Sequence, residues 1–330
     1  MMDNENPIVS VRDLDIKIRL REGILNPVRG INFSVNKNET LGLVGESGCG
    51  KSLTCKAVLG INGKKCISSG EVNFHNEDKI QNLLTMKPGG EAIRKIRGKH
   101  ISMIFQEPMS AFSPLFSIGG QISEVVRLHI TKDKNLAREI ALEAMKKVGI
   151  PNAEKRYRQY PHEFSGGMLQ RALIAMALVC SPRLLIADEP TTALDVTIQA
   201  QILELMKQIQ ADTGMSILFI THDLGAVAKI CDRVAVMYLG KIAEVASVKE
   251  LFGNPLHPYT EGLLASVHKI GSKSSRLFSI EGTVPLAMNL ENRCGFYERC
   301  LKRSEKCRLG GEPPLMEKTK GHYAACWEME

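Results

Sequence analysis

Residues 45–52 read Gly45-Glu46-Ser47-Gly48-Cys49-Gly50-Lys51-Ser52, which fits the pattern G-x-x-x-x-G-K-[ST] at each defined position. Residues 39–44 predict a buried strand that runs into this octet, and residues 53–59 predict the helix that follows it. Glycines at both ends allow a tight turn and a close approach of the backbone to negative oxygens. The helix N-terminus adds partial positive charge. The stretch therefore predicts an α/β fold built around a site for phosphate groups.

The side chains of the octet have separate predicted roles. Lys51 is expected to reach the β- and γ-phosphates of a nucleoside triphosphate, and the Ser52 hydroxyl is expected to coordinate Mg²⁺. The backbone of the loop would surround the phosphates. The predicted nucleotide-binding residues of this segment are Gly45, Glu46, Ser47, Gly48, Cys49, Gly50, Lys51, Ser52 and Leu53.

A second apolar run, residues 184–187, ends in Asp188-Glu189-Pro190. It predicts a central parallel strand that is buried on both faces. Ligands of open α/β sheets bind at the carboxyl ends of the strands, so Asp188 is expected to hold Mg²⁺ there, directly or through water. Glu189 is the predicted general base for the attacking water. An acidic pair that caps an ordinary turn is the alternative, and the phosphate loop in the same chain argues against it.

Two further predicted strands end in polar residues. Residues 101–105 lead to Gln106, and residues 217–221 lead to His222. Gln106 is expected to sense Mg²⁺ or water, while His222 would contact the γ-phosphate and orient Glu189. Either residue, taken alone, would more often be a strand end without chemistry.

These motifs, in this order, resemble the ATP-binding subunit of ATP-binding-cassette (ABC) transporters. The resemblance covers residues from about 8 to 250. It implies a P-loop ABC ATPase core, in which a RecA-like parallel sheet is joined by an antiparallel β subdomain and a helical subdomain at about 107–178. It also implies transport-coupled ATP hydrolysis by residues 1–250, followed by a C-terminal extension at 251–330. The motifs are the phosphate loop, Gln106, Ser165-Gly166-Gly167, Asp188-Glu189, Ala193-Leu194-Asp195 and His222.

The Ser165-Gly166-Gly167 triplet precedes a predicted helix at 168–178. In the ABC family this signature closes over the ATP held by a second subunit, so Ser165, Gly166 and Gly167 are assigned to nucleotide binding, and Asp195 to the dimer seam. A plain helix N-cap is the alternative for the triplet alone. Phe164 and Met168 stand where the family has Leu and Gln, and Leu25 stands where the family often stacks an aromatic side chain on adenine.

A narrower similarity is to the oligopeptide/dipeptide importer branch, which includes nickel and some oligosaccharide importers. It rests on residues 106–110, 164–168 and the heptad Asn254-Pro255-Leu256-His257-Pro258-Tyr259-Thr260. The similarity implies import of di- or oligopeptides, with nickel or oligosaccharide import as alternatives. It implies a peripheral position on the cytoplasmic face of the cell (inner) membrane. The implied partners are a second ABC ATPase subunit in a heterodimer, two integral membrane permease subunits and, indirectly, an extracytoplasmic solute-binding protein.

Composition agrees with a peripheral role. The longest uninterrupted apolar run, residues 172–180, is too short to span a bilayer. The net charge of +7 is spread along the chain without a long basic run, so no nucleic-acid partner is predicted. A soluble ABC ATPase that acts on nucleic acid or ribosomes is the less favoured alternative, because the chain has one phosphate loop and no long heptad run.

Nine cysteines fall into two groups. Five are scattered through the ATPase core and are expected to act as small buried apolar residues: Cys49, Cys55, Cys66, Cys180 and Cys231. The other four, Cys294, Cys300, Cys307 and Cys326, follow the pattern C-x5-C-x6-C-x18-C in a segment with little apolar periodicity.

The wide spacing of these four cysteines favours an iron–sulfur cluster over zinc, whose structural sites usually have C-x2–4-C pairs. Free thiols come third, and disulfides are disfavoured in a cytosolic ATPase. The importer branch has a comparable cysteine-rich segment that can hold a [4Fe–4S] cluster. His322 could replace one ligand, or could stand exposed in a turn.

Two connecting segments are also expected. Residues 109–121 predict an irregular loop that passes the ATP state to a membrane partner, with Phe112, Leu115 and Phe116 either as its apolar contact or packed inside the helical subdomain. Residues 271–275 predict a linker into the cysteine-bearing segment.

Overall fold

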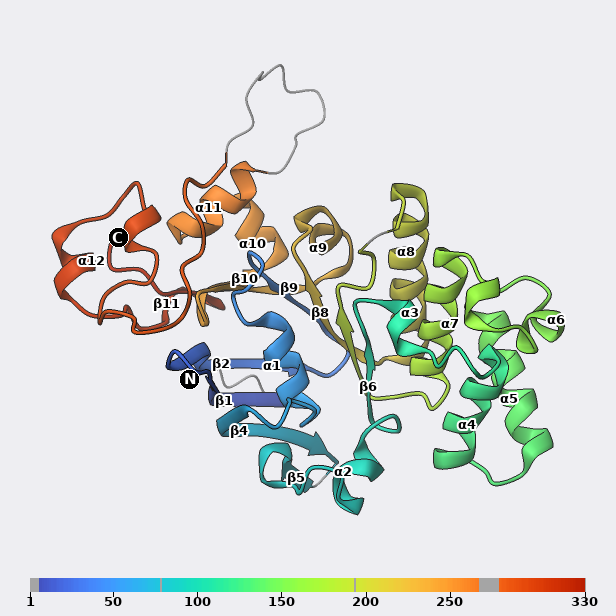
Figure 1. Cartoon of the computed structure of the whole chain (residues 1–330). Helices are drawn as coiled ribbons and strands as arrows, with labels where there is room; N and C mark the ends of the chain where they lie inside the picture. The colour runs from blue at the N-terminus through green and yellow to red at the C-terminus, as the bar shows by residue number, and fades with distance from the viewer. Residues whose placement is uncertain (1–5, 78, 193, 267–278, 330) are drawn as a thin grey trace. The chain divides into compact units, whose positions relative to one another are not determined.

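The computed structural model describes residues 6–329 except 78, 193 and 267–278 (Figure 1). The predicted linker at 271–275 and Ala193 of the 193–195 motif lie outside the described residues. The chain forms two compact units, one made of residues 1–85 and 220–330 and the other of residues 86–219. Within the described ranges, no helix is both long and apolar enough to cross a membrane.

The first unit contains a four-stranded antiparallel sheet in the order β2-β1-β4-β5. Its strands are β1 (Pro7–Arg19), β2 (Ile24–Asn36), β4 (Cys66–Asn76) and β5 (Lys79–Asn82). Alternation in β1 buries Leu14 and Ile16 on one face, as a half-buried strand requires. These strands form the antiparallel β subdomain that the resemblance implied.

A second sheet in this unit has the partial order β11-β12-β10-β9-β3. Its strands are β3 (Thr40–Val44), β9 (Arg233–Tyr238), β10 (Lys241–Ser247), β11 (Met316–Thr319) and β12 (His322–Ala324). Strands β3 and β9 are parallel, whereas β9 and β10 form a hairpin. Leu239 and Gly240 both have positive φ, which is the conformation that a tight two-residue hairpin turn requires.

Short helices complete the first unit. They are α1 (Lys51–Val58), α9 (Leu224–Ile230), α10 (Val248–Gly253), α11 (Pro258–Ala265) and α12 (Glu305–Leu309), with the 3₁₀ turns η1 (Leu83–Thr85) and η3 (Tyr297–Arg299).

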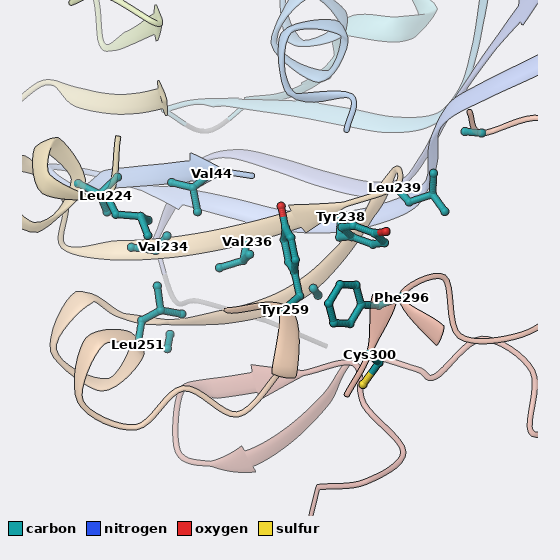
Figure 2. Packing of buried hydrophobic residues seen from close by; sticks show 14 residues of the cluster. Val44, Leu224, Val234, Val236, Tyr238, Leu239, Leu251, Tyr259, Phe296 and Cys300 are labelled. Carbon is teal, nitrogen blue, oxygen red and sulfur yellow. The ribbon is translucent and has the colours of Figure 1, made fainter. Parts of the chain in front are cut away.

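The cysteine-bearing segment, from Cys294 to Cys326, shares its core with the ATPase residues of this unit. Strand β12 pairs with β10, and the Ala325 amide donates to the Ala243 carbonyl at 2.8 Å. Phe296 and Cys300 from this segment pack in one apolar cluster with Tyr238 and Tyr259 (Figure 2). A segment with few apolar residues of its own is therefore stabilised by burying them against the ATPase sheet.

The second unit pairs β6 (Ile101–Ile104) in parallel with β7 (Leu184–Asp188). It ends at Phe219, within β8 (Ser216–Thr221). Several of its helices begin at a side-chain cap, which is provided by Ser117, Asp133, Ser165 and Asp195. The helical segments are α2 (Glu91–Ile96), α3 (Pro108–Ala111), α4 (Ile118–His129), α5 (Lys134–Lys147), α6 (Ala153–Tyr157), η2 (Pro161–Glu163), α7 (Gly166–Leu178) and α8 (Val196–Thr213).

The prediction of an irregular loop over 109–121 is wrong at both ends. Helix α3 occupies its start, and α4 begins at Ile118 because the Ser117 hydroxyl accepts a hydrogen bond from the Gly120 amide. Position 119 of this helix requires a glycine because the Tyr157 ring packs against its backbone: a Cβ there would lie 2.1 Å from Tyr157 Cδ2. The irregular stretch is thus limited to residues 112–117.

The three apolar side chains of this stretch differ in environment. Phe112 is 3% exposed and packs inside the unit, whereas Leu115 and Phe116 are 78% and 62% exposed. Of the two roles considered for these residues, internal packing holds for Phe112, while Leu115 and Phe116 remain accessible to a partner.

Replacing Gly119 by alanine is expected to lower the free energy of unfolding by about 1–3 kcal/mol, because the new methyl group overlaps the Tyr157 ring. Denaturant unfolding of the full-length chain measures the change. Gly253→Ala, also in a helix, is the control, because nothing lies within 4 Å of its Cβ position. Equal stabilities of the two variants would contradict this packing.

Candidate nucleotide site

The phosphate loop connects the buried strand β3 to α1. Gly45 is needed because a Cβ there would lie 2.1 Å from the Met237 carbonyl oxygen. Gly50 has φ of 105° and its Cβ position lies 2.2 Å from the Pro27 carbonyl oxygen. The two glycines of the motif therefore fit between β9 and β2, where any side chain would displace backbone. The predicted strand, loop and helix are confirmed.

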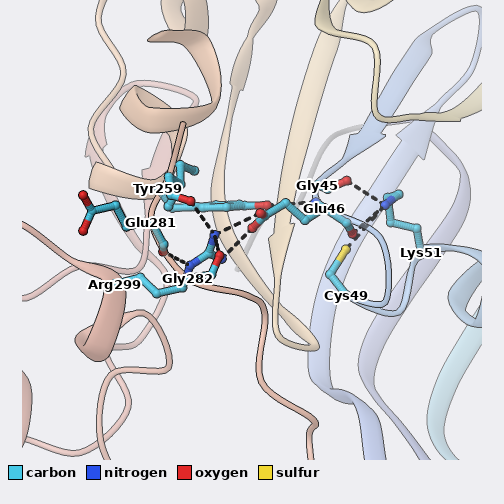
Figure 3. A network of polar contacts seen from close by, with 9 residues as sticks. Gly45, Glu46, Cys49, Lys51, Tyr259, Glu281, Gly282 and Arg299 are labelled. Atoms are coloured by element: carbon cyan, nitrogen blue, oxygen red, sulfur yellow. Dashed lines mark hydrogen bonds and ion pairs between the residues drawn. The ribbon is translucent and has the colours of Figure 1, made fainter. Parts of the chain in front are cut away.

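Lys51 lies over the loop (Figure 3). Its ammonium donates to the carbonyl oxygens of Gly45 at 2.7 Å and Glu46 at 3.0 Å, and lies 3.6 Å from Cys49 Sγ. Burial raises the pKa of Cys49, although Lys51 acts in the opposite direction, so the thiol stays neutral at physiological pH. Lys51 supplies the buried positive charge of the loop.

Glu46 connects the loop to distant segments of the same unit. Its amide donates to Tyr259 Oη at 2.9 Å. Its carboxylate accepts two hydrogen bonds from the Arg299 guanidinium, at 2.7 Å from Nη1 and 3.0 Å from Nη2 (Figure 3). The sequence does not indicate that these two residues belong to the site: Tyr259 lies in the heptad 254–260, and no pattern marks Arg299.

The second unit holds the residues predicted to act on water. Asp188 ends β7 and is 4% exposed. Glu189 follows with φ of 48°, a left-handed conformation that costs roughly 1–3 kcal/mol for a residue other than glycine. Its Oε2 accepts hydrogen bonds from Gln106 Nε2 at 3.1 Å and from Thr192 Oγ1 at 2.9 Å. The structure thus brings Gln106 and Glu189 together, and it adds Thr192, which the sequence analysis did not name.

The signature residues begin α7. Ser165 is exposed and caps the helix, accepting from the Met168 amide at 3.4 Å. Gly167 is required by packing, because a Cβ there would lie 2.9 Å from Ile198 Cγ2 at the start of α8. Asp195 caps α8 through the Ile198 amide at 2.9 Å. The N-terminus of a 13-residue helix is therefore accessible at Ser165 and Gly166, which suits an anion.

The predicted site residues fall into two sets. Residues 45–53 and the exposed His222, which follows β8, belong to the first unit. Gln106, residues 165–167, Asp188 and Glu189 belong to the second unit. Leu25, at the position considered for adenine, lies in β2, where its backbone bridges Met288 and its side chain packs on the apolar cluster.

The four C-terminal cysteines gather in one region. Burial, with smaller contributions from the neighbouring Cys307, Cys326 and Cys300, raises the pKa of Cys294 to about 11. Backbone contact supports this grouping, because the Cys294 amide donates to the Cys307 carbonyl at 3.2 Å. Across the residues that the structure describes, no group of three or more His, Cys, Asp or Glu side chains is arranged to hold a metal ion.

The prediction that the five other cysteines are buried is confirmed only in part. Cys49 and Cys55 are fully buried, whereas Cys66, Cys180 and Cys231 are half-buried.

Of the two roles considered for His322, the exposed position in a turn is wrong. The residue lies in β12, is 1% exposed, and its Nε2 lies 2.7 Å from Oε1 of the buried Glu244. The alternation of β12 turns this side chain into the sheet, where a carboxylate that the sequence did not indicate is its partner.

Comparisons with known proteins agree with this geometry. Residues 28–192 match the family model described as ABC transporter, and residues 243–307 match that of the oligopeptide/dipeptide transporter C-terminal region. The chain is 44% identical to the dipeptide transport ATP-binding protein DppD of Bacillus subtilis, over 97% of this chain and 94% of that protein. It is 46% identical to the oligopeptide transport ATP-binding protein OppD of the same organism, over 97% and 88%. A putative peptide import ATP-binding protein of Brucella melitensis is 45% identical over 98% and 97%.

Solved structures give the same fold. The dimeric ATP-binding cassette MJ0796, bound to ADP and phosphate, aligns with a TM-score of 0.65 at 23% identity over 73% of this chain and 98% of that chain. The cbiO1 subunit of an ABC transporter complex from Clostridium perfringens aligns with a TM-score of 0.62 at 28% identity, over 76% and 92%.

The chain belongs to the ABC transporter family, as the sequence predicted. Its C-terminal region is that of the oligopeptide/dipeptide transporters. The α/β ABC cassette fold is confirmed, and the chain is an ABC-type ATPase.

If Glu189 is the general base, Glu189→Gln is expected to reduce steady-state ATP hydrolysis by about 10²–10⁴-fold, because an amide cannot take a proton from water. ATP binding should be retained. Turnover and ATP affinity of the assembled transporter measure both effects. Glu204→Gln, an exposed change on α8, is the control. Full turnover by Glu189→Gln would exclude this role.

Proposed function

We propose that this chain is the ATP-binding and ATP-hydrolysing subunit that energises an importer of di- and oligopeptides. The observation that supports it best is the near full-length similarity to dipeptide and oligopeptide transport ATP-binding proteins, which includes the C-terminal region. That region is integral to the phosphate-loop unit, because β12 extends the ATPase sheet. The two regions therefore act as one structural body.

In this proposal the two sets of site residues divide the work on ATP. Lys51 and the loop amides bind the β- and γ-phosphates, while His222 contacts the γ-phosphate. Glu189 takes a proton from the attacking water, and its carboxylate is held for this role by Gln106 and Thr192. Ser165, Gly166 and Gly167 bind the ATP of a second cassette through the accessible start of α7.

Mg²⁺ fits the oxygen donors that these residues offer. The Ser52 hydroxyl, the Asp188 carboxylate and the Gln106 amide oxygen are hard ligands of the kind Mg²⁺ prefers. When bound, the ion would neutralise phosphate charge during hydrolysis.

The proposed assembly has this chain on the cytoplasmic face of the membrane. A second ABC ATPase subunit forms the heterodimer, and two integral membrane permease subunits carry the solute delivered by an extracytoplasmic binding protein. Leu115 and Phe116 support a contact with a permease, because they follow Gln106 and are the exposed apolar side chains of residues 112–117.

Reconstitution of the complete transporter in vesicles tests the cargo. A di- or tetrapeptide with its binding protein is expected to stimulate ATP hydrolysis severalfold, and Lys51→Ala, which removes the charge of the phosphate loop, is expected to abolish it. Stimulation by nickel or an oligosaccharide instead of peptides would contradict the proposed cargo. Selective binding of the purified chain to nucleic acid or ribosomes would contradict the transport role.

We also propose that the four C-terminal cysteines hold a [4Fe–4S] cluster. One zinc ion would draw its thiolates to about 3.8 Å from one another, given Zn–S bonds of about 2.3 Å. The described residues include no group of three or more His, Cys, Asp or Glu side chains arranged to hold a metal ion, although the four thiols lie near enough to influence one another. The proposal therefore rests on the wide sequence spacing of the four cysteines, which favours a four-iron cluster over zinc.

Metal analysis of the anaerobically purified chain tests this cluster. About four iron and four sulfide per chain are expected, with a strong loss in Cys307→Ser. Cys180→Ser is the matched control and should keep the iron, because Cys180 lies just after α7 in the ATPase core. One zinc without iron, or no metal at all, would contradict the proposal.

A further inference from the structure

Residues of the heptad 254–260 fix the turn before α11 and the position of Tyr259. The buried Glu244 carboxylate accepts the amides of Leu256 and His257, each at 2.9 Å, and so fixes the turn before α11. His257 Nδ1 then accepts the Tyr259 amide at 3.0 Å. Burial lowers the pKa of His257 to about 4, so the ring stays neutral and can accept. Pro258 fits the first helical position, where no amide is needed.

The result of this arrangement is a fixed Tyr259. Its side chain is fully buried, with the ring centroid 4.7 Å from that of Tyr238 and 5.4 Å from that of Phe296. The Tyr259 hydroxyl accepts a hydrogen bond from the Glu46 amide of the phosphate loop. Because Phe296 belongs to the cysteine-bearing segment, the ring also ties that segment to the loop.

Arg299 contacts the side chain of the same loop residue. It ends η3, one residue before Cys300, and its side chain is 6% exposed. Nε donates to the Glu281 carbonyl at 2.9 Å, which leaves Nη1 and Nη2 directed at the Glu46 carboxylate (Figure 3). A planar guanidinium held at three points has one orientation, so its geometry is set by the segment that carries it.

Charge gives this contact a direct consequence for ATP. Glu46 places a carboxylate in the loop that is proposed to bind a polyphosphate, and like charges repel. Arg299 neutralises that carboxylate with two charge-assisted hydrogen bonds. Without Arg299, the negative charge of Glu46 would oppose ATP, and the Glu46 side chain would lose two hydrogen bonds.

We propose that Arg299 and Tyr259 are positioning residues of the nucleotide site, which hold the phosphate loop through Glu46 and make ATP affinity depend on the folded cysteine-bearing segment. The inference rests on the proposed function only in that residues 45–52 bind ATP. It does not depend on the transported solute.

ATP affinity of the full-length chain tests the proposal, with fluorescent ATP analogue titration as the probe. Arg299→Gln is expected to raise the Kd by about tenfold or more, because the Glu46 charge becomes uncompensated. Tyr259→Phe, which keeps the ring, is expected to raise it by roughly threefold, since the Glu46 amide loses one neutral hydrogen bond. Arg303→Gln, an exposed arginine of the same segment that contacts Glu298 rather than the loop, should leave the Kd unchanged.

A double-mutant cycle separates electrostatic positioning from damage to the fold. Glu46→Gln combined with Arg299→Gln should recover most of the lost affinity, because no charge is then left unpaired. In the assembled transporter, Arg299→Gln should raise KM for ATP with kcat nearly unchanged. Unchanged affinity in Arg299→Gln would overturn the proposal. So would a double variant as weak as the single one.

The test of Arg299 can be separated from a failure to fold and from the test of the transported solute. If Arg299→Gln does not fold, Arg299→Lys takes its place, with an intermediate Kd expected and a wild-type Kd counting against the proposal. Failure of peptide to stimulate the transporter would leave all of these affinities unaffected, so the solute proposal and this one fail separately.

Discussion

The phosphate loop is held by contacts from segments far from it in the sequence, and the organisation of its unit follows from that constraint. Gly45 and Gly50 admit the backbone of β9 and β2 to within a distance that no side chain would allow. Glu46 is fixed by Tyr259 and Arg299. A loop that must present its amides to a polyphosphate needs such external support, because its own glycines give it little rigidity.

The same constraint explains why the cysteine-bearing segment folds as it does. With few apolar residues, it gains stability by adding β12 to β10 and by placing Phe296 among Tyr238 and Tyr259. Glu244 serves both ends of this arrangement, since its carboxylate meets the amides before α11 and the His322 ring in β12. A buried carboxylate with several hydrogen-bonding partners is stable in an apolar core. The segment is therefore a structural part of the ATPase unit.

Sequence patterns predicted the elements whose residues interact locally. The glycines around residues 45–50 and the apolar run before Asp188 each specify a strand or turn within a few residues. The pairing of Gln106 with Glu189 was within reach for a similar reason, because both follow neighbouring parallel strands. Gly119 was misassigned to a loop, since only the Tyr157 ring across the unit makes a glycine necessary there. Arg299 and His322 could not be assigned, because their partners lie about 250 and about 80 residues away and no local pattern marks them.

The central claim is that the C-terminal segment holds the phosphate loop, and amide hydrogen exchange measures this most directly. Full-length wild type and Arg299→Gln would be compared without nucleotide, with peptides covering residues 45–52 as the region of interest. The account predicts faster exchange at Glu46 and its neighbours in the variant, with unchanged exchange in β1 and α5. Equal protection of the loop in the two proteins would contradict it.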